Sequence, residues 1–186
     1  MAKWGAVFLV LMVGLGQVKG QLAPPTPPPK KSITISDGSS LLGWKAPLGK
    51  WSLVSSAKPN LINANDFTLV PGKGILVNGI NGKSENLFSN FQHGDVQAAI
   101  EYILPKGSNS GIYFQGRYEL QILDSFGKKI MTPEENGGIY PQAIKGIKVG
   151  GNAPIINASK PPGQWQKFIV IFRGVSWILL YFGNVQ

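Results

Sequence analysis

The stretch GSNSGIYFQGRYELQILDS, from Gly107 to Ser125, decides the fold of this chain. Within it, Tyr118, Leu120 and Ile122 alternate with polar residues. A period of two residues is typical of a β-strand that buries one face and leaves the other open. The polar residues of the open face are Arg117, Glu119 and Gln121. We expect this face to be either a solvated sheet surface or the floor of a binding site.

Further strand patterns surround this stretch. DVQAAIEYIL, at residues 95–104, is the longest, and QWQKFIVIFRG, at residues 164–174, is apolar through its middle. Residues 127–162 carry little periodicity and predict loops. Shorter strands are predicted at residues 33–36, at residues 49–54, and on both sides of a Pro71-Gly72 turn within residues 67–79. Many short strands with close turns predict an all-β antiparallel β-sandwich.

Composition narrows the class of protein. The chain has 186 residues, 43% of them hydrophobic, with 24 Gly and 14 Pro. This size suits one domain, and the Gly and Pro content favours a β-rich fold with many turns. The absence of cysteine excludes disulfides, thiol catalysis and cysteine-based metal sites. The single histidine, His93, excludes a multi-histidine metal site, and its place before Gly94 favours a surface or strand-entry role over catalysis.

The N-terminus reads as an export signal. A short basic start precedes the apolar run GAVFLVLMVGLG, and QVKG then offers a cleavage site before Gln21. The run is too short for a spanning helix, and an uncleaved membrane anchor is the alternative. We expect a signal peptide at residues 1–20 and a periplasmic or secreted protein with no stable membrane insertion after cleavage. Residues 21–32 contain a stiff Pro-rich linker that cannot build a core.

The charge of the chain is strongly positive, with a formal net charge of +9. A basic balance can indicate a nucleic acid or another anionic polymer as partner. The lysines are scattered, however, and only Lys30-Lys31 and Lys128-Lys129 are adjacent. We therefore expect no nucleic-acid partner.

Several motifs together resemble one known family. In order, they are DGSSLLGWK, GKWSL, GKGILVN, FQHGDVQAAIEYILPKGSNSGIYFQGRYELQILDSFG, GGIYPQ and NASKPPGQWQKFIVIFR. In this order they are similar to the 3-keto-disaccharide hydrolase domain. The resemblance implies a jelly-roll sandwich of the concanavalin A-like lectin and glucanase type over residues 33–174, and carbohydrate processing outside the cytoplasm.

The end of the chain departs from this family pattern. After Arg173 the sequence reads GVSWILLYFGNVQ, in which Trp177 to Phe182 is apolar without polar alternation. We expect an atypical, truncated or altered tail at residues 175–186. The alternative is one last buried strand. A sandwich that lacks strands would leave an open edge and an uncovered apolar face.

The resemblance implies a substrate whose sugar carries a ketone at C3. A base could remove the C2 hydrogen, the enolate could expel the group at C1, and water could then add. Direct displacement with two carboxylates is the alternative mechanism. Glu119 is the best candidate for the base, with Arg117 or Lys160 for the oxyanion and Asp124 as a second carboxylate or metal ligand. The expected substrate-binding residues are Gln121, Asn109, Tyr113, Glu101, Lys160 and Trp165.

These residues also have purely structural interpretations. Arg117 and Glu119 fit an ion pair on an exposed sheet, and Asp124 fits a turn cap. Trp165 fits a core position, and Lys160 fits a solvated loop. We expect no cofactor, and a calcium-like ion held by carboxylates and backbone carbonyls stays open.

The functional expectation is an exported hydrolase that acts on 3-keto-glycosides, with a carbohydrate as its partner. One alternative is a non-catalytic carbohydrate-binding module on the same sandwich, which needs aromatic and hydrogen-bonding groups but no base. The other is an inactive, truncated remnant of the family.

Overall fold

The computed structural model describes residues 8–12, 33–79, 84–173 and 176–182. These residues form strands, turns and loops, and none of them belongs to a helix that could cross a membrane. The strands are β1 (Phe8–Met12), β2 (Ser52–Pro59), β3 (Phe67–Val77), β4 (Val96–Ile103), β5 (Asn109–Phe114), β6 (Tyr118–Leu123), β7 (Gln142–Ile144), β8 (Ile147–Val149), β9 (Gln166–Arg173) and β10 (Ser176–Phe182).

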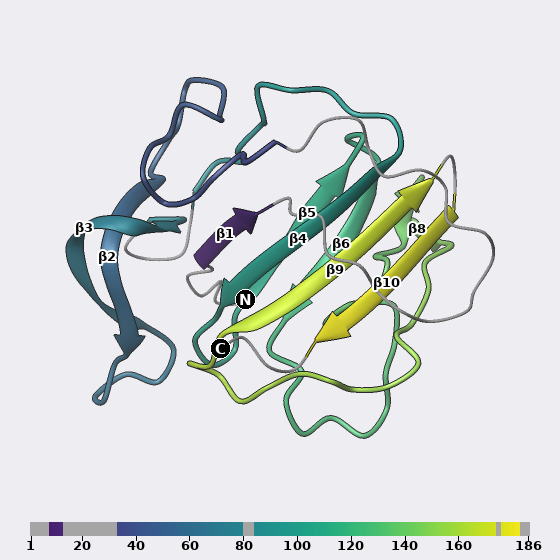
Figure 1. The fold of residues 1–186 in the computed structure, drawn as a ribbon. Coiled ribbons are helices and arrows are strands. Elements are labelled where there is room, and N and C mark those ends of the chain that lie inside the picture. The colour runs from purple at the N-terminus through teal and green to yellow at the C-terminus, as the bar shows by residue number, and fades with distance from the viewer. Residues whose placement is uncertain (1–7, 13–32, 80–83, 174–175, 183–186) are drawn as a thin grey trace.

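One large sheet and two hairpins make up the fold (Figure 1). The large sheet has the order β10-β9-β4-β1-β3-β2, while β5 pairs with β6 and β7 pairs with β8. All of these pairs are antiparallel. The predicted all-β antiparallel sandwich is therefore confirmed.

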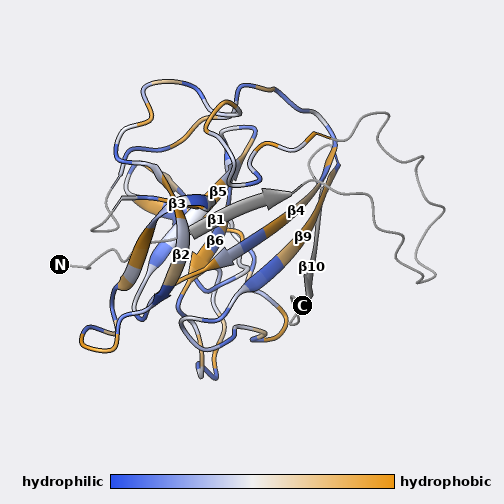
Figure 2. Cartoon of the chain, turned by 60° about the vertical axis from the view of Figure 1, so that its left-hand side comes forward, coloured by the Kyte–Doolittle hydropathy of each residue, from blue (hydrophilic) through white to orange (hydrophobic). Residues whose placement is uncertain are grey.

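The β5–β6 hairpin packs against β4 and β9, and this contact forms the main core. Ile100 and Tyr102 of β4 and Phe168 of β9 are fully buried. Alternate residues of a strand point to the same face, so Ile100 and Tyr102 lie on the same face of β4. They share one apolar cluster with Leu120 and Ile122 of β6. Figure 1 shows the hairpin as a layer behind β4 and β9, and Figure 2 shows apolar and polar segments interleaved along those two strands.

A smaller cluster lies on the other side of β4, toward β2 and β3. Its buried members are Val54, Phe67, Val77 and Ile103, and Trp165 packs against them. Ile103 directly follows Tyr102 on β4, so the two side chains point to opposite faces of the sheet. The large sheet thus buries apolar residues on both of its faces.

Pro71 and Gly72 lie inside strand β3 and not at a turn between two strands. Val54 of β2 pairs with both Pro71 and Ile75, so the residues between them bulge out of β3. Gly72 and Gly74 have φ angles of 147° and 128°, which side-chain-bearing residues rarely adopt. The prediction of two strands in residues 67–79 was wrong, because Pro and Gly also mark bulges.

Three shorter predictions also needed correction. Residues 33–36 form no strand, and the strand predicted at residues 49–54 begins only at Ser52 and continues to Pro59. Residues 127–162 are mostly loops but include the β7–β8 hairpin. Its turn at Lys145-Gly146 has φ angles of 49° and 79°, as two-residue hairpin turns require. Strands of three residues are too short to show a period in the sequence.

Two strands lie in segments that the sequence set apart from the domain. β1 falls within the predicted signal peptide, and in the sheet it pairs with β4 along its whole length and with β3 at one end. β10 falls within the predicted atypical tail and pairs with β9 along its whole length. The predicted cleavage site and the Pro-rich linker lie outside the described residues.

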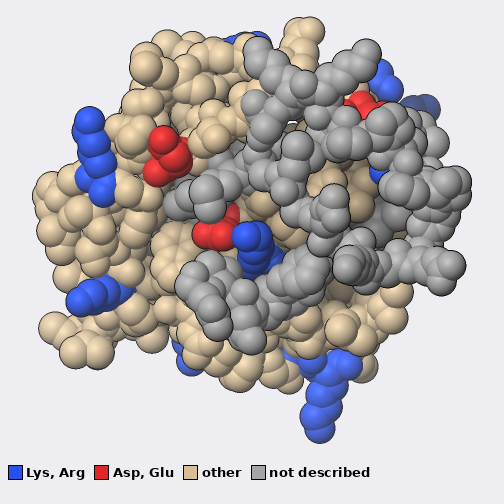
Figure 3. All heavy atoms as spheres, viewed as in Figure 1, with Lys and Arg blue, Asp and Glu red and all other residues tan. Residues whose placement is uncertain are grey.

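The charged side chains are spread over the surface. On the face shown in Figure 3, the Lys and Arg side chains drawn in blue lie apart from one another and do not gather in one patch. The ion pairs among the described residues are Lys128–Glu135, Lys148–Glu134 and Lys167–Glu101.

Candidate functional site

The register of the β5–β6 hairpin determines which side chains meet. Tyr113 lies directly opposite Glu119, and Gly111 lies directly opposite Gln121. These residues occupy the face that points away from the large sheet, because their neighbours Leu120 and Ile122 belong to the main core.

Residues 115–117 form the hairpin loop, so Phe114 pairs with Tyr118. Arg117 N donates to Phe114 O at 3.1 Å, and the two residues between them, Gln115 and Gly116, have φ angles of 52° and 65°. Positive φ at both central positions is typical of the tight turns that match the twist of paired strands.

A short hydrogen bond joins the two polar side chains of this face. The Tyr113 hydroxyl donates to Glu119 Oε2 at 2.7 Å. Burial raises the pKa of the Glu119 carboxyl above its ordinary value, while the hydrogen bond from Tyr113 acts in the opposite direction. Burial, followed by the hydrogen bond to Glu119 and its negative charge, raises the pKa of Tyr113 to about 12. Tyr113 is therefore a hydrogen-bond donor at neutral pH, and Glu119 is a stronger base than an exposed glutamate.

Gly111 makes room for the Glu119 carboxylate. A Cβ atom built on Gly111 would lie 2.1 Å from Glu119 Oε1 and 2.7 Å from its Cγ. Any side chain at position 111 would thus displace the carboxylate from its place over β5. Isolated glycines in strands often mark such close approaches.

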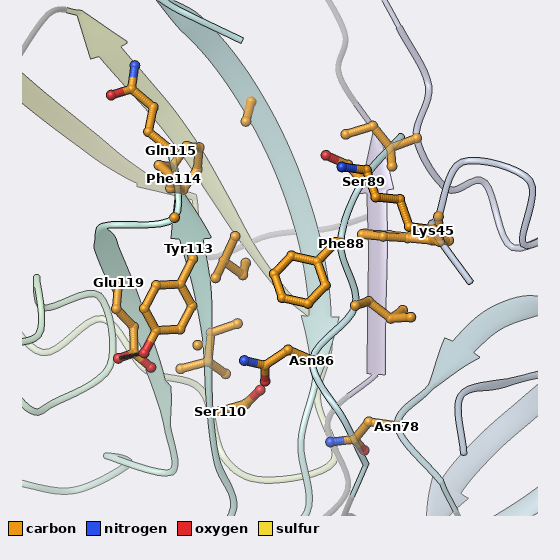
Figure 4. A pocket seen from close by; sticks show the side chains of 18 of the residues that line it. Lys45, Asn78, Asn86, Phe88, Ser89, Ser110, Tyr113, Phe114, Gln115 and Glu119 are labelled. Carbon is orange, nitrogen blue, oxygen red and sulfur yellow. Dashed lines mark hydrogen bonds between the residues drawn. The ribbon is translucent and has the colours of Figure 1, made fainter. Parts of the chain in front are cut away.

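A cleft of about 1020 Å³ runs along β5. One wall is the strand itself, from Asn109 to Gly116, together with Glu119. The other wall is the segment Ser84–His93, with Trp44, Lys45 and Trp51. Figure 4 shows Tyr113 and Glu119 together on one side of β5, and Ser110 pointing the other way, toward the wall that carries Asn86 and Phe88.

The opposite edge of the hairpin is covered. Gln121 N donates to Gly138 O at 2.8 Å, Gly137 N donates to Gln121 O at 2.9 Å, and Tyr140 N donates to Glu119 O at 2.9 Å. The segment Gly137–Tyr140 thus serves β6 as a neighbouring strand would. It holds the backbone of Glu119 on the side away from the cleft.

A buried polar network anchors this covering segment. Asn136 Nδ2 donates to the Tyr102 hydroxyl at 2.8 Å, and Asn136 Oδ1 accepts from Leu123 N at 3.2 Å. The Glu135 carboxylate accepts from Ser125 Oγ and pairs with Lys128 Nζ, both at 2.6 Å. Because Tyr102 belongs to β4 and Leu123 to β6, Asn136 ties the two layers of the sandwich together.

The structure brings three of the predicted site residues to the cleft, namely Glu119, Tyr113 and Asn109. Gln121 lies on the same face of β6, but it is 2% exposed and does not line the cleft. Its Nε2 donates to Asn109 Oδ1 and to Glu134 O, both at 3.1 Å. In this arrangement Gln121 orients Asn109 and is not free to bind a sugar hydroxyl.

The other two predicted catalytic residues do not line the cleft. Arg117 is exposed at the hairpin turn, where its carbonyl accepts from Gln142 Nε2, and it takes part in none of the ion pairs of the described residues. Asp124 Oδ2 accepts from Gly107 N at 2.9 Å and closes the turn that leads into β5. Of the three predicted catalytic residues, only Glu119 lines the cleft.

The three remaining predicted binding residues also lie away from the cleft. Glu101 pairs with Lys167 at 3.0 Å, on the face of the large sheet that points away from the β5–β6 hairpin. Trp165 packs against the smaller apolar cluster. Lys160 is half-buried, and its backbone N–H donates to Gln166 Oε1 at 3.2 Å. Glu101 and Trp165 use their side chains within the large sheet, and Lys160 is bound through its backbone.

Sequence reasoning missed Gly111 and the whole second wall of the cleft. A lone glycine inside a strand pattern is a recognised signal of close approach, so Gly111 could have been found. Asn86 and Phe88 gave no such signal, because they lie in a segment without periodicity. Phe88 is 63% exposed, while its backbone is held by a 2.7 Å hydrogen bond from Lys45 N.

His93 lines the cleft and lies among aromatic rings. Its ring centroid is 5.8 Å from that of Phe114, 5.9 Å from that of Phe91 and 6.1 Å from that of Phe172. Its Nδ1 donates to Gly94 O at 2.8 Å. Within the described part of the chain, no cluster of three or more His, Asp or Glu residues is arranged to hold a metal ion.

Comparison with protein families gives one match. Residues 31–183 match the model of the 3-keto-alpha-glucoside-1,2-lyase-like domain. The chain belongs to this family. The 3-keto-alpha-glucoside-1,2-lyase-like domain includes both walls of the cleft and all strands from β2 to β10. It places the chain among carbohydrate-active, hydrolase-like domains. Comparison with curated proteins gives no match, and neither does comparison with solved structures.

Proposed function

We propose that this chain cleaves 3-keto-glycosides in the cleft along β5, with Glu119 as the catalytic base. One observation carries the proposal. A half-buried carboxylate with a raised pKa lines a cleft large enough for a sugar, and a tyrosine hydroxyl holds it in place. A carboxylate with a raised pKa is a stronger base than an ordinary glutamate.

The family description, a 1,2-lyase acting on a 3-keto-glucoside, suggests where the proton comes from. The ketone at C3 acidifies the hydrogen at C2. Glu119 takes this proton, and the C–H electron pair forms the enolate. When the enolate collapses, the C3 ketone is restored, a double bond forms between C1 and C2, and the C1–O bond breaks. The departing oxygen leaves with the bonding pair and takes a proton from water, which becomes hydroxide.

The fate of the unsaturated sugar decides between a lyase and a hydrolase. If water adds across the new double bond, hydroxide joins C1 and a proton joins C2, and the net reaction is hydrolysis. Glu119 carries the abstracted proton after the first step and can return it to C2 in the second. One carboxylate therefore suffices for both steps.

Tyr113 orients the base. Its pKa of about 12 keeps the hydroxyl protonated at neutral pH, so it donates to Oε2 throughout. Oε1, which lies over Gly111, is then the oxygen that faces the C2 hydrogen. Polar side chains along both walls, including Asn109, Ser110 and Asn86, supply partners for sugar hydroxyls.

Export is part of the proposal. A signal peptide at residues 1–20 would deliver the protein to the periplasm or the medium, where glycans are its substrates. N-terminal sequencing of the protein from fractionated cells tests this point. Mature protein beginning at Gln21 outside the cytoplasm supports export, and full-length protein in the cytoplasm refutes it.

The test of the activity uses the full chain and methyl 3-keto-glucoside. We expect NMR and mass spectrometry to detect released methanol with either the unsaturated 3-keto sugar or 3-keto-glucose. Saturable binding without any product would instead favour a carbohydrate-binding module.

A further inference from the structure

Hydrogen bonding along β5 alternates between its two edges. Ser108 O accepts from Asp124 N at 3.0 Å, and Phe114 O accepts from Arg117 N at 3.1 Å, so both carbonyls point toward β6 and its flanks. In an antiparallel pair, residues that bond to the partner strand alternate with residues that point away from it. Ser110 and Ile112 therefore bond to β6. Gly111, which lies between Ser110 and Ile112, points its backbone N–H and C=O away from β6.

The same alternation holds on β6. Gln121 and Glu119 use their backbone groups to bond with the covering segment Gly137–Tyr140 and not with β5. Their register partners on β5 are Gly111 and Tyr113. The N–H and C=O groups of Gly111 and Tyr113 must accordingly point toward the outer edge of β5. Within the described part of the chain, no strand pairs with that edge, and the cleft runs along it.

The backbone of Gly111 lies close to the carboxylate of Glu119, the proposed base. Glu119 Oε1 lies over Gly111, close enough that a Cβ atom at this position would meet it at 2.1 Å. An oxygen atom bonded to the Gly111 N–H would thus lie beside the proposed base. Arg117, predicted for the oxyanion, does not line the cleft, and neither does Lys160, the other candidate.

We propose that the backbone N–H of Gly111 stabilises the enolate oxygen at C3 of the substrate. This inference rests on the proposed function. As Glu119 takes the C2 proton, negative charge moves onto the C3 oxygen, and the N–H donates a hydrogen bond to it without giving up its proton. A donor that is already oriented favours the charged state over the neutral ketone. Gly111 then has two roles, since its missing side chain also admits the carboxylate.

The test replaces this N–H with an ester oxygen. Incorporating glycolic acid at position 111 of the full chain replaces the amide with an ester and leaves every side chain unchanged. We expect kcat for methyl 3-keto-glucoside to fall about a hundredfold or more, with a much smaller change in KM. The control is the same replacement at Gly94, which is exposed and has open space around it. A kcat at position 111 equal to that of this control would overturn the proposal.

A second measurement separates this inference from the proposed function. In ¹⁵N-labelled Glu119→Gln protein, titration with methyl 3-keto-glucoside should move the Gly111 amide proton downfield, whether or not the wild type turns over. Turnover without this shift, together with an unaffected ester variant, overturns the role of Gly111 and leaves the function standing. The amide shift in Glu119→Gln, combined with a wild type that forms no product, overturns the proposed reaction alone. Absence of both binding and turnover overturns both.

Discussion

The Tyr113 hydroxyl bonds to Glu119 Oε2 at 2.7 Å because the two residues are direct cross-strand partners in the β5–β6 hairpin. Their side chains emerge on the same face at the shortest separation that an antiparallel pair offers, since they form a non-hydrogen-bonded pair. The catalytic proposal depends on this register. A slip of one residue would turn Glu119 into the core.

Replacing Glu119 by Gln should abolish turnover and keep the fold. Gln can still accept the hydrogen bond from Tyr113, but it cannot accept the C2 proton. We expect kcat to fall about a thousandfold, the range of a lost general base. Product formation by NMR measures this, with Glu101→Gln as the control because Glu101 does not line the cleft. Unchanged turnover in Glu119→Gln would remove this residue from the mechanism.

Replacing Tyr113 by Phe should move the pH profile. The hydrogen bond from Tyr113 lowers the pKa of Glu119, so its loss should raise that pKa further. Because the base acts only when deprotonated, the acid-side limb of kcat/KM should shift to higher pH. The measurement is kcat/KM across the acidic and neutral range for both proteins. An acid limb that stays in place would show that Tyr113 does not tune the base.

Replacing Gly111 by Ala should impair activity more than stability. The new methyl group would collide with the Glu119 carboxylate, which must swing away from β5. We expect kcat to fall by about tenfold or more, consistent with a displaced catalytic group. Gly94→Ala is the matched control, because nothing lies within 4 Å of a Cβ atom there. Equal activity of the two variants would argue against the close approach at position 111.

The pH dependence of stability should also reveal the raised pKa of Glu119. Its pKa in the folded protein lies above the value of 4.5 for the free side chain, so between these values the folded state binds more protons than the unfolded state. The raised pKa of Glu119 therefore makes its full stabilising contribution to the free energy of unfolding below pH 4.5. This contribution is lost as the pH rises through the folded-state pKa. The Tm of Glu119→Gln minus that of the wild type should grow over this window. A difference that does not change with pH would contradict the raised pKa.

Asn136 should be a strong determinant of stability. Its removal takes away the partner of the Leu123 N–H and the shorter of the hydrogen bonds to the buried Tyr102 hydroxyl, which keeps Gln166 Oε1 at 3.4 Å. One unsatisfied buried group costs about 1–3 kcal/mol, so Asn136→Ala should lower the free energy of unfolding by about that amount. Chemical denaturation measures this, with exposed Asn152→Ala as the control. A loss no larger than that of the control would mean that the network does not hold the two layers together.

Much of the fold could be predicted because the long strands carry their own periodicity. Strands β4, β6 and β9 alternate over at least six residues, which is enough to define a face. The bulge in β3 could not be separated from a turn, because Pro71 and Gly72 suit both. The β7–β8 hairpin has strands too short to show a period.

The residues of the candidate site could be predicted only where they lie on the same hairpin. Glu119, Asn109 and Tyr113 come from the hairpin that the alternation identified, and they meet in the cleft. Glu101 and Trp165 were assigned to the same cleft, but the structure places them on another face of the large sheet or at its edge. A single strand shows which residues share a face, whereas the pairing between distant strands determines which faces meet.

Strand β1 links the proposed export signal to the architecture of the sheet. It lies between β4 and β3 and comes from the segment that a signal peptidase would remove. Cutting before Gln21 would leave β10-β9-β4 and β3-β2 as two separate groups of strands, each with a newly bare edge. Precursor and processed protein would then differ in shape as well as in length, and maturation would be a remodelling step.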